Sequence, residues 1–321
     1  MPREGKDEVA RVLGSPVARA ARVYGGYAPS ATFRMVLADG RRAFFKGVNG
    51  THNEHMHRAL PREERVYRSL APLLGRWAPA FHGSFRRLDW HVLLLEDLGA
   101  QTMPPWSPAK ARRSARSYAA FHASTYGRSL PRWLRRTEHH DFADLWRTLG
   151  ASGDLGGTAR LARRRADEAL EWLDVALPVL RERALDLRRL PPPHSLMHFD
   201  TRSDNVRLQG DELRIFDWNF ASVGPHEMDA AAFAQATEAE GGPRAERILA
   251  WYTEVHPVRD RHLDACVAGI AGYFADRAWR EPVPGLPRLR SWQRRQFKVS
   301  LAWAARRLGL PEPSWLAAVP D

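Results

Sequence analysis

Residues 198–205 read HFDTRSDN, so two aspartates, two basic side chains and an amide fall within eight positions. The stretch follows the triple proline of LPPPHSLM and has apolar neighbours. A polar surface loop is the simplest explanation of such a run. The sequence on either side decides whether the run is instead a catalytic loop.

Asp217 lies twelve positions beyond Asn205, at the end of the apolar run LRIFDW. Between the two residues, NVRL and LRIF read as short strands and QGDE reads as the turn of a hairpin. Such a hairpin brings Asn205 and Asp217 back to the same end. Amide and carboxylate oxygens, completed by phosphate oxygens and water, suit Mg²⁺. Asp200, five positions before Asn205, could then accept a proton from an attacking hydroxyl.

This combination resembles a protein-kinase signature, in which H-R-D-x-x-x-x-N supplies a base aspartate and a metal-binding asparagine, and a metal-binding aspartate follows on a strand. The pair Asp217-Trp218, in place of D-F-G, resembles the aminoglycoside phosphotransferase family, which comprises kinase-like enzymes acting on small molecules. That family carries another aspartate about twelve residues on, which corresponds to Asp229. The resemblance extends from about residue 20 to about residue 235 and implies an α+β, two-lobed, protein-kinase-like fold.

The pattern of apolar residues agrees with a strand-rich N-lobe over residues 1–98 and a helical C-lobe over residues 99–321. Alternating runs on either side of Asp39-Gly40 predict a hairpin, and PREERVYRSLAPLLG predicts a helix from Pro61 to Gly75. After residue 100, SPAKARRSARSYAAFHAST and GTARLARRRADEALEWLDVAL predict long helices, and Pro178 predicts the start of another.

Lys46 is the candidate phosphate ligand of the N-lobe. Only four of the 49 basic residues are lysines, so a lysine in the apolar run AFFKGV calls for a specific reason. The resemblance implies that Lys46 contacts the phosphates of ATP and pairs with a glutamate of the following helix. Glu63 and Glu64 are the two candidates, and the spacing to Leu70 favours Glu63.

Two further stretches are candidates for nucleotide binding. GGYAPSATF stands where kinases have a loop over the phosphates, and although it lacks G-x-G-x-x-G, Ser30 and the backbone N–H groups around it could hold a phosphate. LLLEDLG resembles the hinge between kinase lobes, so the backbone from Glu96 to Leu98 is expected to pair with adenine.

The sequence departs from the family pattern at two positions. Phe199 replaces a usual glycine, and Asn219 stands where many members have an acidic residue. Arg202 occupies the position at which protein kinases often carry a lysine that faces the γ-phosphate. Its guanidinium could stabilise the charge of the transferring group in a bidentate manner, or it could be one more surface arginine of an arginine-rich chain.

Composition excludes several other classes. A single cysteine, Cys266, permits no intrachain disulfide and no cysteine metal cluster. The charged start lacks the apolar core of a secretory signal, and the apolar run HVLLLEDL is too short to span a membrane, so a cytoplasmic protein without membrane contact is expected. The net charge of +12 comes from arginines spread along the chain without nucleic-acid-binding motifs, so nucleic acid is not an expected partner.

The expected reaction is Mg²⁺-dependent transfer of the γ-phosphoryl group of ATP to a hydroxyl of a small molecule. Residues 226–265 hold eight acidic residues and four arginines, a net charge of −4, which favours a cationic aminoglycoside-type antibiotic or amino sugar and hence a role in antibiotic resistance. Residues 276–308 hold nine basic and two acidic residues, a net charge of +7, which favours the alternative of a neutral or anionic metabolite. Because residues 226–265 directly follow the catalytic hairpin, and the effect of exposed charges fades over about 8 Å, the cationic acceptor is the prediction. A catalytically inactive nucleotide-binding module is the remaining alternative.

Overall fold

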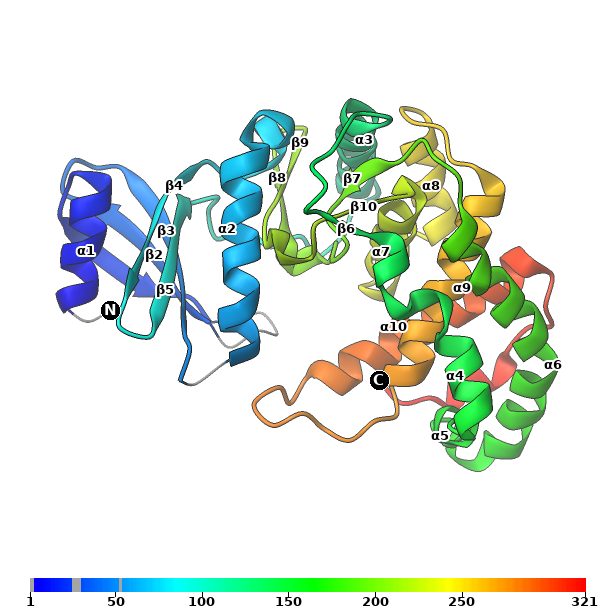
Figure 1. The fold of residues 1–321 in the computed structure, drawn as a ribbon. Coiled ribbons are helices and arrows are strands. Elements are labelled where there is room, and N and C mark those ends of the chain that lie inside the picture. The colour runs from blue at the N-terminus through cyan, green and yellow to red at the C-terminus, as the bar shows by residue number, and fades with distance from the viewer. Residues whose placement is uncertain (1–2, 25–29, 52–53) are drawn as a thin grey trace. The chain divides into compact units, whose positions relative to one another are not determined.

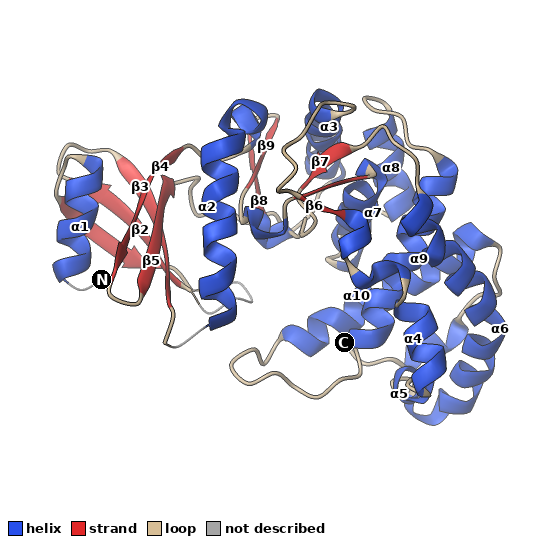
Figure 2. Ribbon diagram, in the orientation of Figure 1, coloured by secondary structure: helices blue, strands red, loops and turns tan. Residues whose placement is uncertain are grey.

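The structure is a computed structural model that describes residues 3–24, 30–51 and 54–321. The chain forms two compact units, one of Met1–Met103 with Asp204–Ala221 and the other of Pro104–Ser203 with Ser222–Asp321. Most strands belong to the first unit, whereas the second consists mainly of helices (Figure 1 and Figure 2). The predicted α+β architecture, strand-rich first and helical afterwards, is confirmed.

The first unit is built on an antiparallel sheet of five strands in the order β1-β2-β3-β5-β4. The predicted hairpin is the pair β2–β3, in which Val36 lies opposite Arg42. Gly40 has a φ of +84°, a left-handed conformation that glycine adopts without steric cost, so the tight turn falls where the sequence predicted it. The strands are β1 (Val17–Arg22), β2 (Ala31–Leu37), β3 (Arg42–Asn49), β4 (Phe81–Arg87) and β5 (Trp90–Glu96).

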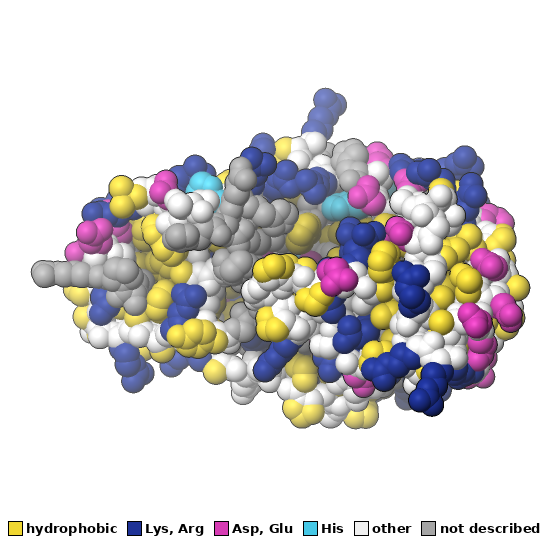
Figure 3. All heavy atoms as spheres, turned by 90° about the horizontal axis from the view of Figure 1, so that it is seen from below, with side chains coloured by type: hydrophobic (Ala, Val, Ile, Leu, Met, Phe, Trp, Pro, Cys, Tyr) yellow, Lys and Arg dark blue, Asp and Glu magenta, His cyan; other side chains and the backbone are white. Residues whose placement is uncertain are grey.

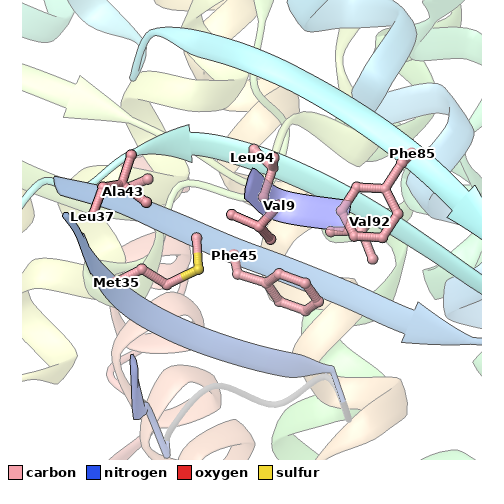
Figure 4. Packing of buried hydrophobic residues seen from close by; sticks show 8 residues of the cluster. All are labelled: Val9, Met35, Leu37, Ala43, Phe45, Phe85, Val92 and Leu94. Carbon is pink, nitrogen blue, oxygen red and sulfur yellow. The ribbon is translucent and has the colours of Figure 1, made fainter. Parts of the chain in front are cut away.

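The two faces of this sheet meet different helices. On one face, Val9 of α1 (Arg3–Leu13) packs into a buried cluster of strand side chains (Figure 4). Successive strand residues point to opposite faces, so Lys46 points away from its neighbour Phe45 and toward α2 (Glu54–Leu74). The remaining cluster members are Met35, Leu37, Ala43, Phe85, Val92 and Leu94.

Helix α2 starts earlier than the sequence predicted. Its first residue is Glu54, so Pro61 lies inside the helix rather than in its first turn. Proline lacks an N–H and therefore removes one intrahelical hydrogen bond, which the long helix tolerates here. The end of the helix agrees with the prediction, because Gly75 has a φ of +45° directly after Leu74.

The hairpin of β8 (Val206–Gln209) and β9 (Glu212–Ile215) belongs to the first unit, although the predicted boundary assigned all of residues 99–321 to one lobe. Polar contacts explain this grouping. The guanidinium of Arg214 donates to the Ala78 carbonyl at 2.9 Å and to the Glu96 carboxylate, so β9 is bonded to both ends of the segment that forms β4 and β5.

The second unit contains long helices and a short three-stranded sheet in the order β6-β10-β7. The start of α3 is as predicted, because the Ser107 hydroxyl accepts a hydrogen bond from the Lys110 N–H at 3.2 Å and Pro108 is the first helical residue. The elements are α3 (Pro108–Thr125), β6 (Arg135–Arg136), α4 (Leu145–Ser152), α5 (Leu155–Arg160), α6 (Ala166–Leu185), β7 (Ser195–Met197), β10 (Ser222–Gly224), α7 (His226–Ala239), α8 (Ala245–Thr253), α9 (Asp260–Arg277) and α10 (Leu289–Leu308).

The predicted division of residues 157–185 is wrong. The sequence predicted one helix up to Leu177 and another from Pro178, whereas α6 runs through Pro178 without interruption. The break occurs earlier, at Arg163, whose φ of +54° is left-handed and separates α5 from α6. No glycine or proline marks that position, so the sequence contained no local signal for it.

Two surface features complete the description. Within residues 3–24, 30–51 and 54–321, no helix is both long enough and apolar enough to cross a bilayer. Lysine and arginine side chains are dispersed over the face shown in Figure 3, with acidic side chains among them, rather than gathered in one stripe.

Candidate active site

Lys46 is a buried cation with two carboxylate partners. Its Nζ donates to Oε2 of Glu63 at 2.6 Å and to Oδ1 of Asp217 at 2.8 Å, and the residue is only 6% exposed. Burial alone would lower the pKa of Lys46, but the two carboxylates outweigh it and raise that pKa above its usual value. The ammonium group is therefore charged and held in one place.

The two neighbouring glutamates of α2 have different partners. Glu63 meets Lys46, and burial raises the pKa of Glu63 to about 7 while Lys46 opposes this rise. Glu64 instead accepts hydrogen bonds from Ser84 at 2.5 Å and Arg68 at 2.8 Å, and its other oxygen lies 2.7 Å from Nε2 of His91. Successive helical residues differ in direction by about 100°, which separates the two carboxylates.

Asp217 and Asn205 lie together at the open end of the β8–β9 hairpin. Val206 pairs with Ile215, and the Phe216 N–H donates to the Asn205 carbonyl at 3.0 Å, so the two strands bring these residues to one end as the sequence predicted. Asp217 has φ +69° and ψ +53°, a left-handed conformation that aspartate tolerates better than most residues.

Trp218 holds the Asp217 turn in place. Its indole is fully buried, and Nε1 donates to the Ile215 carbonyl at 2.8 Å. The tryptophan of the Asp217-Trp218 pair therefore works as a structural anchor, while the Asp217 side chain is still 21% exposed. This exposure leaves part of the carboxylate accessible to a ligand.

The oxygen donors of Asn205 and Asp217 fit a hard cation such as Mg²⁺. Among the described residues there is no group of three or more His, Cys, Asp or Glu side chains that could hold a metal ion. The two oxygen donors would therefore act with phosphate oxygens and water, which is the usual mode for Mg²⁺ bound with a nucleotide.

In the second unit, Asp229 of α7 fixes the backbone that leads to Asp200. Its carboxylate accepts the N–H of His198 at 2.6 Å and of Phe199 at 2.8 Å. Burial would raise the pKa of Asp229, but hydrogen bonds from His122 and Tyr118 outweigh it and lower that pKa. A buried, ionised aspartate thus holds the two residues immediately before Asp200.

Tyr118 and His122 are functional candidates that the sequence analysis missed. The Tyr118 hydroxyl donates to Asp229 at 2.6 Å and lies 2.6 Å from the Thr201 hydroxyl, while Nε2 of His122 lies 3.3 Å from Asp229. Both side chains are fully buried on α3. Their spacing of four residues on an otherwise apolar helix face was the available signal.

Phe199, which replaces the family's usual glycine, has a φ of +68°. A left-handed conformation costs a non-glycine residue about 1–2 kcal/mol, so the surroundings must compensate for it. Besides its bond to Asp229, the Phe199 ring stacks on His140 with ring centres 4.0 Å apart and meets Phe142 edge-on at 5.3 Å.

Asp200 and Arg202 form an ion pair within the second unit. Nε of Arg202 lies 3.2 Å from Oδ1 of Asp200, and the guanidinium carbon lies 5.4 Å from the centre of the Trp292 ring. Arg202 is therefore not a freely solvated surface arginine, since a carboxylate and an aromatic face both orient it.

Glu240, at the end of α7, also contacts the catalytic-loop segment and was missed by the sequence analysis. Its carboxylate accepts from the Ser203 hydroxyl at 2.6 Å and from Nε1 of Trp106 at 2.9 Å. The first bond holds Ser203, three residues after Asp200, next to the end of α7.

The remaining predicted nucleotide contacts have structural partners of their own. The Ser30 carbonyl accepts from Arg22 at 3.0 Å, and residues 25–29 of the predicted phosphate loop GGYAPSATF lie outside the described residues. The N–H of Glu96 donates to the Ala80 carbonyl at 2.9 Å, and the Glu96 side chain accepts from Ala80 and Arg214. Leu98 follows as a half-buried residue.

Comparison with known proteins agrees with this geometry. A family model described as the phosphotransferase enzyme family matches residues 21–263. No sequence among the curated proteins matches the chain.

Several solved structures share the fold at low sequence identity. The spectinomycin phosphotransferase APH(9)-Ia, solved with ADP and spectinomycin, is 14% identical with a TM-score of 0.61, and the match covers 96% of this chain and 99% of that one. Amicoumacin kinase hAmiN, solved with AMP-PNP, Ca²⁺ and its ligand, is 12% identical with a TM-score of 0.56, and the match covers 94% and 93%. A putative fructosamine-3-kinase from Thermobifida fusca is 20% identical with a TM-score of 0.52, and the match covers 92% and 98%.

The family match spans most of the chain and includes the HFDTRSDN loop, the hairpin and Asp217. The chain therefore belongs to the phosphotransferase enzyme family and is a small-molecule kinase of the aminoglycoside phosphotransferase type.

Proposed function

We propose that this protein transfers the γ-phosphoryl group of ATP, with Mg²⁺, to a hydroxyl of a small molecule. The observation that carries the proposal is the buried contact of Lys46 with Glu63 and Asp217. A lysine held by a helix glutamate beside a metal-binding aspartate is the arrangement that kinases use to position nucleotide phosphates. Family membership supports the same reaction type.

In this proposal Asp200 orients the acceptor hydroxyl and takes its proton. The hydroxyl oxygen attacks the γ-phosphorus, the bond between that phosphorus and the bridging oxygen breaks, and ADP leaves with the electron pair. Arg202 is positioned beside Asp200 to stabilise charge on the transferring group. Asp229 keeps the loop rigid, so catalysis comes mainly from positioning and electrostatics.

Lys46 would contact the nucleotide phosphates, and Asn205 and Asp217 would hold Mg²⁺. The metal ion supplies positive charge that neutralises the phosphate oxygens. Ser30 is proposed to contribute to phosphate binding, and the backbone of Glu96 to Leu98 to adenine binding. Since the Glu96 N–H is already bonded to Ala80, Glu96 can contribute only its carbonyl group.

An aminoglycoside-type antibiotic or amino sugar is the acceptor class that the family resemblance suggests. The names of solved structures with the same fold support it, because they include complexes with spectinomycin, streptomycin and gentamicin. With an antibiotic as its acceptor the protein would confer antibiotic resistance.

The charge of residues 226–265 does not add support for a cationic acceptor. All eight carboxylates of that segment make hydrogen bonds or ion pairs within the second unit. Their partners are Arg259 for Glu227, Tyr118 for Asp229, the Ala245 N–H for Glu238, Ser203 for Glu240, Arg306 for Glu246, Arg112 for Glu254, and Arg307 for both Asp260 and Asp264.

One screen tests the proposed reaction. Purified protein is incubated with ATP, with and without Mg²⁺, over a panel of aminoglycosides, amino sugars, neutral sugars and hydroxylated acids, while ADP release and product mass are measured. We expect Mg²⁺-dependent ADP release that rises with one acceptor class and yields a product heavier by one phosphoryl group. Tight ATP binding without turnover on any acceptor would instead identify an inactive nucleotide-binding module.

A further inference from the structure

The side chains next to Asp200 lead directly to the end of α9 and the start of α10. On one side, Phe199 contacts Phe142, which stacks on Tyr273 of α9 with ring centres 4.9 Å apart. On the other side, Arg202 lies over the Trp292 ring of α10. Trp292 therefore contacts the catalytic loop directly, and Tyr273 is separated from it by one side chain, that of Phe142.

Arginines dominate this part of the second unit. The Arg277 guanidinium lies 5.8 Å from the centre of the Tyr273 ring, and its side chain is 42% exposed. Arg290 donates to the Arg277 carbonyl at 3.1 Å and to the Gln293 side chain at 2.7 Å. Burial and the nearby charges of Arg277 and Arg280 lower the pKa of Arg290. The cations are close enough to repel one another.

Asp276 and Asp154 are the carboxylates that act on Arg277 and Arg280. Asp276 is shared, since one oxygen lies 3.1 Å from Nε of Arg277 and the other accepts from Arg280. Asp154 adds attraction for Arg280. Arg277 thus shares Asp276 with Arg280, while Arg290 donates its hydrogen bonds to uncharged oxygens, the carbonyls of Glu281 and Arg277 and the side chain of Gln293.

At the C-terminal end of α10, the arginines have carboxylate partners of their own. Arg306 pairs with Glu246 at 2.8 Å, and Arg307 pairs with Asp260 at 2.8 Å and Asp264 at 2.5 Å. The basic and acidic segments noted in the sequence therefore neutralise each other at the C-terminal end of α10. Near its N-terminal end, by contrast, Arg290 is bonded to uncharged oxygens, and Arg277, which lies beside the Tyr273 ring, shares its carboxylate partner with Arg280.

We infer that the acceptor carries a negatively charged group, a phosphate or a carboxylate, which Arg277 binds with support from Arg290, in place of the cationic aminoglycoside that the family resemblance suggests. This inference rests on the proposed phosphotransfer to a hydroxyl at Asp200 and specifies its substrate class. A guanidinium matches the geometry of either anion with two parallel hydrogen bonds. Arg277 can turn to such a ligand because Asp276 keeps Arg280 as a partner. Tyr273 and Trp292 supply flat surfaces for the carbon skeleton.

Matched acceptors test the inference in the full-length protein. Glycerol 3-phosphate and gluconate serve as anionic probes, glycerol and glucose as their neutral counterparts, and glucosamine and kanamycin as cationic probes. We expect kcat/KM for at least one anionic probe to exceed that of its neutral counterpart by about tenfold or more, because each charge-assisted contact has this size. A preference for neutral or cationic probes would overturn the inference and leave the proposed kinase reaction intact.

Calorimetry of Mg·ATP binding separates the two proposals. Mg·ATP binding with turnover on any probe supports the reaction, whatever the charge preference. Absence of both Mg·ATP binding and turnover would reject the proposed function and, with it, the inference.

Substitution of Arg277 tests whether this residue binds the anionic group of the acceptor. Arg277→Gln should raise KM for the preferred anionic acceptor by about tenfold to a hundredfold, and Arg277→Lys should recover part of this loss. Arg181→Gln, at an exposed position of α6, is the matched control and should leave KM unchanged. Thermal unfolding of each variant checks the fold, and an unchanged KM in folded Arg277→Gln would contradict the assignment.

Discussion

The Lys46 ammonium donates a hydrogen bond to Asp217 at 2.8 Å, although the two residues are 171 positions apart in the chain. Glu63 accepts from the same nitrogen at 2.6 Å. A buried cation with two anions is compensated, and removing one anion leaves part of its charge unbalanced. The three residues should therefore respond to substitution in different and measurable ways.

Asp217→Ala should abolish the effect of Mg²⁺ on ATP binding, because the variant loses the proposed carboxylate ligand. We expect Mg·ATP affinity to fall by about tenfold or more, with ATP affinity in the absence of Mg²⁺ much less affected. Calorimetric titration with and without Mg²⁺ measures both values. Unchanged Mg·ATP affinity would assign Asp217 a structural role.

Glu63→Gln and Glu64→Gln form a matched pair on adjacent residues of α2. Glu63→Gln should lower the free energy of unfolding by about 1–3 kcal/mol and weaken Mg·ATP binding, because the buried Lys46 then keeps only one anionic partner. Glu64→Gln should leave Mg·ATP affinity unchanged, since Glu64 bonds Ser84, Arg68 and His91 instead. Urea unfolding and calorimetry compare the two, and equal losses of affinity would contradict this division.

Asp200→Asn should reduce kcat by at least about 10²-fold, the usual size of a general-base contribution. Nucleotide affinity should barely change, because Lys46 and Asp217 belong to a separate cluster in the first unit. Steady-state kinetics with the best acceptor from the screen, together with ATP binding, provide the test. Equal turnover in the variant and the parent would remove Asp200 from the mechanism.

Arg202→Ala should lower kcat more than it lowers ATP affinity, if the guanidinium stabilises charge that develops during transfer. Arg202→Lys should retain part of the activity, because the charge stays while bidentate hydrogen bonding is lost. Kinetics of both variants at saturating ATP distinguish the roles. Parental kinetics in Arg202→Ala would mean that the ion pair with Asp200 is structural only.

His226 should make stability depend on pH. Burial is the main cause that lowers its pKa to about 3, with Glu227 opposing and His122 and His256 adding to the shift. Between about pH 6.5 and pH 3 the unfolded chain binds a proton that the folded state refuses, so the free energy of unfolding falls as pH falls. His226 lowers the free energy of unfolding by at most about 5 kcal/mol between about pH 6.5 and pH 3, and above about pH 6.5 this loss is absent.

His226→Gln should flatten this dependence, because glutamine does not titrate and can still donate to the Pro257 carbonyl, which His226 contacts at 3.0 Å. Urea unfolding of the parent and the variant at pH 7.5, 6 and 5 gives the two slopes. Parallel curves would show that other groups account for the acid sensitivity.

The parts of the fold that the sequence predicted well depend on local chemistry. Turn residues at Asp39-Gly40 and QGDE correctly located two hairpins, and Ser107-Pro108 correctly located the start of α3. Where local signals conflicted with tertiary packing, packing prevailed. Pro61 and Pro178 were read as helix starts, yet both lie inside helices whose other turns are held by their surroundings.

For the candidate site, too, the sequence predicted some features and not others. The spacing of Asp200, Asn205 and Asp217 indicated phosphotransfer without knowledge of any contact, and Lys46 stood out because lysine is rare in this chain. The residues that hold these side chains in place could not be predicted from the sequence. Tyr118, His122 and Glu240 come from distant helices, and only folding brings them to the loop that contains Asp200.

The sequence by itself determined the phosphotransferase family, because a short set of residue types at set spacings is enough to distinguish its kinase-like catalytic loop from a polar surface loop. Only the tertiary structure decided which charges remain available to an acceptor. The acidic stretch 226–265 and the basic stretch 276–308 suggested opposite substrates, yet Arg306 and Arg307 neutralise part of the acidic stretch, whereas Arg290 is bonded to uncharged oxygens and Arg277 shares Asp276 with Arg280. Electrostatic energy depends on distance and on burial, and net charge counted along a chain contains neither.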